Sequence, residues 1–227
     1  RGERWESVWL SDPSAGGSKE VVHRTSALAA RAKGGLWVGN EGGQVFEVTD
    51  RRVHRRLPVD LQGRRVTALY EDRHGALWIG SQRGLIRWHQ QVVTRWSAED
   101  GLSPGVVRAI LEVPDADEMW VGTYGGGLSR LRGDEVTRLT TEHGLIEHVV
   151  SSILLDDKGF VWLNGNMGVS RASLASLRDV VEGRATHVRV EHYESGEGNG
   201  GNAPAAALSS DGGVWFPTIH GLVHIAQ

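Results

Sequence analysis

Four histidines occur in two pairs that could hold a metal ion if each pair lay on one helix face. His143 and His148 flank the segment Gly-Leu-Ile-Glu, and His187 and His192 have a similar spacing. A metal site needs both imidazoles of a pair to point at one ion. Both pairs fall in segments with loop or strand character, so we predict ordinary surface or core histidines and no metal site.

The motifs of common catalytic sites are missing from this sequence. It has no Gly-x-Ser-x-Gly, no His-Glu-x-x-His, no phosphate-loop pattern and no cysteine. Aspartates such as Asp156 and Asp157 stand where turns are expected, and turn formation accounts for them without catalysis. We therefore predict no catalytic residue, no metal ligand and no cofactor.

A group of polar side chains follows five tryptophan-containing segments, and these are the candidate ligand-binding residues. They are Asn40, Glu41, Gln82, Arg83, Tyr124, Asn166 and His220. Amides, charged groups and a tyrosine on one rim would suit a polar ligand such as a saccharide or a peptide. The alternative for any one of them is a solvated hairpin tip.

The elements that must position these side chains belong to an internal repeat. Its phrases align on five tryptophans: Trp37, Trp78, Trp120, Trp162 and Trp215. A glycine stands six residues after each tryptophan: Gly43, Gly84, Gly126, Gly168 and Gly221. Each unit reads as four short strands joined by polar or glycine turns, which is the pattern of a propeller blade. We interpret the five rings as structural blade core, because a blade needs its neighbours to bury both faces of its sheet.

The predicted fold is all-β, a β-propeller of five four-stranded antiparallel blades in one domain of 227 residues. The blades are expected at about residues 22–61, 62–102, 103–145, 146–195 and 196–227, with residues 1–12 as an outer strand. A short helix is expected near residues 173–182, where Leu174, Leu177 and Val181 have helical spacing after the N-cap candidate Ser173.

Ring closure stays open at the level of sequence. Residues 1–12 resemble the fourth-strand segments of other repeats, which permits a five-bladed ring closed by that strand. The pattern equally permits an open arc from a larger ring. Such an arc would expose two apolar blade faces, and these would favour a homodimer.

Composition excludes several classes of protein. The net charge of -3 gives no basic field that would attract nucleic acid. No apolar run approaches the ~20 residues of a membrane helix. The chain begins with Arg-Gly-Glu-Arg-Trp and no signal-peptide core follows, so we expect a fragment whose targeting sequence lies upstream.

The repeats resemble the two-component regulator propeller family. The phrases "GLSPGVVRAILEVPDADEMWVGT", "GLIEHVVSSILLDDKGFVWLNG" and "GRRVTALYEDRHGALWIGS" carry the resemblance. The first replaces the usual Asp-x-x-Gly turn, and the second departs at Leu163 and Asn164. The helix near 173–182 followed by "DGGVWFPTIHGLVHI" is similar to the last blade of such propellers.

The resemblance implies a non-catalytic sensor outside the cytoplasm, in the periplasm or on the extracellular face of the inner membrane. It implies a ring typically of seven blades, which weakly favours an open arc. It also implies that signalling domains of the same parent chain, a histidine kinase or a diguanylate cyclase, receive the signal. The expected ligand is a small polar molecule or oligosaccharide.

Two alternatives remain open. One is a propeller enzyme similar to streptogramin lyases, since "GGVWFPT" resembles their phrases. A lyase would need a His and Glu cluster at the channel to support a metal, and no repeat-aligned pattern supplies one. The other alternative is a protein-interaction scaffold.

Overall fold

The computed structural model describes residues 11–12, 20–21, 24–50, 52–114, 116–193, 206–218 and 221–226. Within them the chain forms a small two-stranded sheet near the N-terminus and five further antiparallel sheets, called blades 1 to 5 in chain order. Every strand of a blade pairs with the next strand along the chain. The predicted all-β propeller of five blades is therefore confirmed, although the described part of blade 5 has three strands.

The bounds of the strands follow the repeat. Blade 1 holds β3 (Thr25–Ala30), β4 (Leu36–Asn40), β5 (Val45–Thr49) and β6 (Arg52–Arg56). Blade 2 holds β7 (Val66–Glu71), β8 (Leu77–Ser81), β9 (Gly84–His89) and β10 (Val92–Trp96). Blade 3 holds β11 (Val106–Val113), β12 (Glu118–Tyr124), β13 (Gly127–Arg132) and β14 (Glu135–Leu139). Blade 4 holds β15 (Ser152–Leu155), β16 (Phe160–Gly165), β17 (Gly168–Ser173) and β18 (Val190–Tyr193). Blade 5 holds β19 (Ala207–Leu208), β20 (Val214–Thr218) and β21 (Gly221–Ile225).

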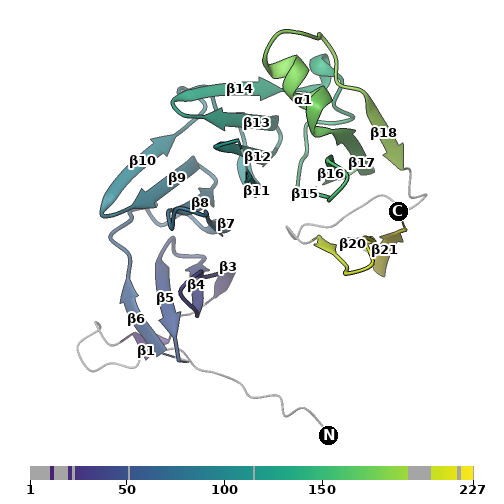
Figure 1. The fold of residues 1–227 in the computed structure, drawn as a ribbon. Coiled ribbons are helices and arrows are strands. Elements are labelled where there is room, and N and C mark those ends of the chain that lie inside the picture. Colours follow the sequence, from purple (N-terminus) through teal and green to yellow (C-terminus); the bar gives the residue numbers. More distant parts are fainter. Residues whose placement is uncertain are drawn as a thin grey trace, which may run out of the picture.

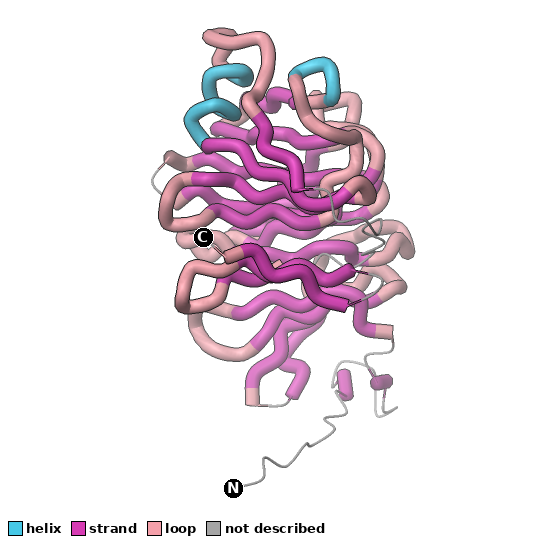
Figure 2. The backbone as a smooth tube through the Cα atoms, turned by 90° about the vertical axis from the view of Figure 1, so that its right-hand side faces the viewer, coloured by secondary structure: helices cyan, strands magenta, loops and turns pink. Residues whose placement is uncertain are grey.

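The blades are arranged in a ring around a common centre, and blades 1 and 5 stand at the two ends of the arc (Figure 1). The first strands, β3, β7, β11 and β15, lie innermost, and the fourth strands lie at the periphery. Seen from the side, the strands of neighbouring blades lie side by side, and the helical segments lie at one edge of the molecule (Figure 2).

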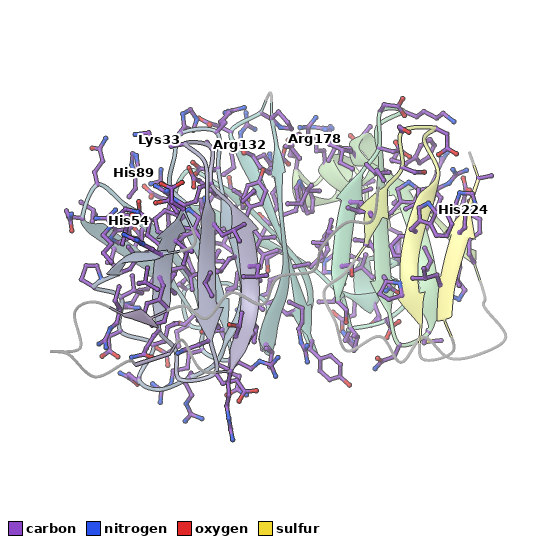
Figure 3. The ribbon with its side chains drawn as sticks, turned by 90° about the horizontal axis from the view of Figure 1, so that it is seen from below. Lys33, His54, His89, Arg132, Arg178 and His224 are labelled. Carbon is purple, nitrogen blue, oxygen red and sulfur yellow. The ribbon has the colours of Figure 1, made fainter. Side chains whose placement is uncertain are left out.

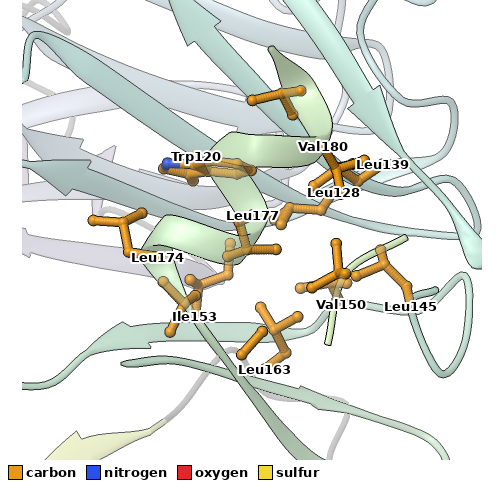
Figure 4. Close-up of a cluster of buried hydrophobic side chains, with 14 of the residues drawn as sticks. Trp120, Leu128, Leu139, Leu145, Val150, Ile153, Leu163, Leu174, Leu177 and Val180 are labelled. Carbon is orange, nitrogen blue, oxygen red and sulfur yellow. The ribbon is translucent and has the colours of Figure 1, made fainter. Parts of the chain in front are cut away.

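One α-helix interrupts blade 4, as the sequence predicts near residues 173–182. Helix α1 (Leu174–Val181) lies between β17 and β18, and the Ser173 hydroxyl accepts a hydrogen bond from the Ser176 backbone N–H. Its apolar side packs into the core between blades 3 and 4, where Leu177 is fully buried (Figure 4). A 3-10 turn, η1 (Thr141–His143), follows β14.

Blades pack face to face, with the tryptophan of one blade against the aliphatic face of the next. Trp37 packs with Leu77 and Ile79 of blade 2, and Trp162 packs with Val214 and Phe216 of blade 5. Trp78 and Trp120 fill the corresponding layers between blades 2 and 3 and between blades 3 and 4. Burying an aromatic ring in each layer removes roughly 150–250 Å² of surface from water, which stabilises the stack.

The two outward faces at the ends of the arc are less covered. Trp215 of blade 5 is 37% exposed, whereas Trp37, Trp78, Trp120 and Trp162 are at most 7% exposed. Leu222 lies on the same face as Trp215 and is 69% exposed. On the outward face of blade 1, Leu28 is 59% exposed, whereas Val38 and Phe46 on the same face are at most 3% exposed.

The predicted outer strand at residues 1–12 lies largely outside the described residues. Its last two residues form β1 (Ser11–Asp12), which pairs with β2 (Glu20–Val21). Strand β1 contacts β6 of blade 1. Among the helices of the described residues, none is long and apolar enough to cross a membrane.

Candidate ligand-binding site

The centre of the arc is a cavity of about 470 Å³ between the first strands of the blades. Its lining is mostly Ala, Leu and Ile from β3, β7, β11 and β15. The polar side chains in the lining are Thr25, Ser26, Thr67, Arg108 and Ser152. Arg108 is the one charged side chain among the described residues that line this cavity.

The cavity ends at a rim formed by the turns that follow the Trp-bearing strands β4, β8, β12 and β16; we call it the Trp-turn rim. Strand register fixes this placement, since Val106 at the start of β11 pairs with Tyr124 at the end of β12. The turns at the other ends of the strands form the opposite rim. Lys33, Arg132 and Arg178 lie along that opposite rim, the upper edge of Figure 3.

Small hydroxyls in the channel wall link neighbouring blades. The Ser26 hydroxyl donates to the Val66 carbonyl at 2.7 Å, and the Thr67 hydroxyl donates to the Val107 carbonyl at 2.5 Å. Both residues sit at shifts in strand register, where a β-bulge turns their side chains toward the next blade. These hydroxyls therefore satisfy buried backbone groups and stabilise the channel wall.

Two of the predicted ligand-binding residues meet on the Trp-turn rim. The Asn166 side-chain amide donates to the Tyr124 hydroxyl at 3.4 Å across the gap between blades 4 and 3. The Arg108 guanidinium lies 5.5 Å from the centre of the Tyr124 ring. Tyr124 remains 39% exposed, so an aromatic ring, an amide and a cation gather at one accessible point.

Burial lowers the pKa of Arg108 from its ordinary value, and the positive charge of Arg65 lowers it further. Arg65 also lies 4.0 Å from a Glu41 carboxylate oxygen, and Arg24 lies 3.3 Å from the other Glu41 oxygen. Glu41 thus lies between Arg24 and Arg65 on this rim.

The remaining predicted residues are dispersed. Asn40 is 5% exposed, and its side chain makes hydrogen bonds to both the backbone and the side chain of Gln44. The Asn40 amide therefore stabilises the turn in which it lies. Gln82 and Arg83 line a separate cavity of about 320 Å³ with Glu99, between blades 2 and 3. His220 lies outside the described residues.

The opposite rim carries its own cavity, also of about 320 Å³, between blades 2 and 3. Its wall includes Trp78 and Trp96, whose rings stack at 5.4 Å, and several carboxylates. Nearby, the Tyr70 hydroxyl donates to Glu112 at 3.1 Å, and burial together with that carboxylate raises the pKa of Tyr70 to about 12.

A network of buried charged side chains borders the same cavity and links helix α1 to blade 3. The Glu118 side chain is 1% exposed and accepts hydrogen bonds from Arg130 at 2.5 Å and from Arg178 of α1 at 2.7 Å. Because each charge is paired, the network positions the helix instead of presenting a free group to a ligand.

The histidines of the first pair have local partners. A ring nitrogen of His143 lies 3.1 Å from the Thr140 hydroxyl, and one of His148 lies 3.1 Å from the Thr141 hydroxyl. The described part of the chain holds no group of three or more His, Cys, Asp or Glu side chains that could bind a metal ion.

Sequence reasoning missed Arg108, although a signal was present. In the aligned repeats the residue before the alanine of the first strand is Ser26, Thr67 and then Arg108. An arginine at a position that holds a serine or a threonine in the two preceding blades is a departure from the repeat. Such departures often mark functional positions.

Comparison with known proteins adds a family match and a set of similar folds. Residues 60–83, which include β7 and the Trp78 strand β8, match the family model described as two component regulator propeller. Residues 60–83 are therefore similar to a repeat of this family, in line with the resemblance seen in the sequence. No curated protein matches the sequence.

Two similar structures are extracellular domains of proteins described as hybrid two-component systems from B. thetaiotaomicron. The first is 21% identical with a TM-score of 0.65, and the alignment covers 85% of this chain and 26% of that one. The second is 19% identical with a TM-score of 0.67, covering 89% of this chain and 29% of that one. This chain thus spans less than a third of the length of these two proteins.

A third similar structure is virginiamycin B lyase from Staphylococcus aureus. It is 13% identical with a TM-score of 0.66, and the alignment covers 89% of this chain and 70% of the lyase. At these identities the likenesses establish the propeller fold alone.

Proposed function

We propose that this chain is a non-catalytic sensor propeller of a bacterial two-component or related membrane signalling protein. In this proposal it lies outside the cytoplasm, binds a polar ligand at the Trp-turn rim, and passes the signal to a separate kinase or cyclase domain. The observation that carries the proposal is the match of residues 60–83 to the two component regulator propeller model. The extracellular domains with the same fold are consistent with it.

The chemistry of the Trp-turn rim supports a polar ligand. Tyr124, Asn166 and Arg108 supply an aromatic face, an amide and a guanidinium next to a cavity of about 470 Å³. Binding sites of this volume commonly combine apolar walls with a few convergent polar groups. A saccharide presents both apolar ring faces and hydroxyls, so it matches this lining.

A thermal-shift screen against oligosaccharides and short peptides tests the proposal. At a ligand concentration of 100 times Kd, binding should stabilise the fold by about 2.7 kcal/mol and raise Tm by roughly 5–10 °C. The paired variant Tyr124→Ala with Asn166→Ala should lose most of this shift, and Lys33→Ala on the opposite rim should keep it. A shift that survives the paired variant unchanged would argue against the Trp-turn rim.

A lyase is the second candidate, and the observation that favours it is the shared fold with virginiamycin B lyase. Quinupristin, the compound present in one lyase structure, is the direct probe. Turnover of quinupristin that depends on an added divalent metal would establish the enzyme. If the binding assay shows no binding and the turnover assay shows no turnover, the result would favour a protein-interaction scaffold.

A further inference from the structure

Arg108 occupies a repeat position that has a different task in the two preceding blades. Ser26 and Thr67 are the bulge residues of β3 and β7, and each hydroxyl binds the first strand of the next blade. In β11 the register shifts between Val107 and Ala109, so Arg108 is the bulge residue there. The bulge directs a guanidinium into a wall that otherwise presents small hydroxyls.

The surroundings of Arg108 suit an anion. It is the one charged side chain among the described residues lining the central cavity. The Ser26 and Thr67 hydroxyls in the same wall donate to backbone carbonyls, so the contact with an anion falls to the guanidinium. Among the described residues, the positive charge of Arg65 acts on Arg108, and the Arg108 guanidinium lies 5.5 Å from the centre of the Tyr124 ring. Glu41 engages Arg24 and Arg65 at the rim.

We propose that the central cavity recognises the anionic group of an acidic saccharide, with Arg108 as the residue that binds this group. The inference rests on the proposed function, since it names the ligand class of the same site. A planar guanidinium can bind two oxygens of a carboxylate, sulfate or phosphate at once. Tyr124 then offers its ring and hydroxyl to the neutral part of the sugar.

Isothermal titration calorimetry with matched sugars tests this proposal. The probes are glucose, glucuronate, glucosamine 6-sulfate and glucose 6-phosphate, so that the acidic arms separate carboxylate, sulfate and phosphate. At least one acidic sugar should bind the unmodified protein about tenfold or more tightly than glucose. Raising the salt concentration should weaken that advantage.

The variants are chosen from the repeat itself. Arg108→Ser installs the residue that blade 1 carries at this position, so folding is preserved, and Tm with near-UV circular dichroism checks this. Arg108→Ser should reduce the preference for the acidic sugar to within about twofold of glucose, while Arg108→Lys should keep part of it. Arg132→Ser removes an exposed arginine on the opposite rim and should change nothing.

The outcomes separate the two proposals. Equal binding of glucose and the acidic sugars, unchanged in Arg108→Ser, would overturn the anion inference and leave the sensor proposal intact. An acidic preference that persists in Arg108→Ser would place the anion elsewhere and also overturn it. No binding of any of these sugars would overturn it as well, and the sensor proposal would then depend on the wider thermal-shift screen.

Discussion

At the scale of single residues, one aspartate organises the turn before the tryptophan in blades 2 and 4. Asp72 accepts hydrogen bonds from two backbone N–H groups and from the Trp78 indole at 2.8 Å. Asp156 does the same, with the Trp162 indole at 2.7 Å. In blade 3 the residue six before Trp120 is Pro114, and the buried Trp120 indole nitrogen has no hydrogen-bond partner among the described residues.

Asp156→Ala should therefore destabilise the fold. The substitution leaves buried N–H donors without their acceptor, which costs about 2–3 kcal/mol of unfolding free energy. Asp157→Ala, at the exposed neighbouring position, should change it by less than about 0.5 kcal/mol. Urea denaturation measures both variants. Equal losses in the two variants would mean that the turn tolerates the missing carboxylate.

The role of a single residue was predictable where the same residue recurs in several repeats, and it was not predictable where the repeats differ. The turn aspartates could be predicted from the Asp-x-x-Gly pattern, because local backbone groups are their partners. The network of Glu118 with Arg178 could not, because 60 residues separate the partners and only the packed helix brings them together. The ligand roles of all seven candidate residues stay predictions: Asn40, Glu41, Gln82, Arg83, Tyr124, Asn166 and His220.

At the scale of elements, the glycine two residues after the tryptophan sets how closely blades approach. A Cβ on Gly80 would lie 2.7 Å from the Val107 side chain, and one on Gly122 would lie 2.6 Å from the Val150 side chain. The glycine of the Trp-x-Gly phrase therefore makes room for the first strand of the next blade. In blade 4 the position holds Asn164, which is where the sequence departs from the family pattern.

Gly122→Ala should lower stability by about 1–3 kcal/mol, because the added methyl overpacks the contact between blades 3 and 4. The Cβ would also lie 2.8 Å from the Val150 carbonyl oxygen, and backbone moves less readily than a side chain. Gly42→Ala is the matched control, since its nearest atom would be 3.5 Å away. A calorimetric Tm for Gly122→Ala no lower than that of Gly42→Ala would contradict this role.

At the scale of the whole molecule, both ends of the arc expose apolar side chains. Blade 5 exposes Trp215 and Leu222 on one face, and blade 1 exposes Leu28 and Leu36 on one face. In blade 2 the counterpart of Leu36 is Leu77, which is fully buried against blade 1. The end faces therefore leave part of their apolar surface exposed, although Val38, Phe46 and Val48 on the outward face of blade 1 are at most 6% exposed.

We expect these end faces to make the chain self-associate as its concentration rises. The paired variant Leu28→Glu with Leu222→Glu should reduce association, because burying the new charges is costly. Val92→Glu changes an exposed valine on the outer strand of blade 2 and should leave association unchanged. Sedimentation velocity reports the outcome, and a monomer at every concentration would contradict the expectation.

The repeat made the blades, their number and the helix predictable, because each depends on contacts within about one or two repeats. Whether the ring is closed was not predictable from the sequence, because closure depends on what packs against blades 1 and 5. The site was predictable only in part. Tyr124 and Asn166 are candidates because they follow Trp strands, whereas Arg108 lies on β11 and was not among the candidates from the sequence.

The central claim is that ligand recognition takes place at the Trp-turn rim. Hydrogen–deuterium exchange, with and without the compound that raises Tm most, tests it most directly. We expect the backbone amides of residues 106–109, 122–127 and 163–168 to exchange more slowly when the compound is bound. Slower exchange at the opposite rim, at residues 72–76 or 174–182, with no change at the Trp-turn rim, would contradict it.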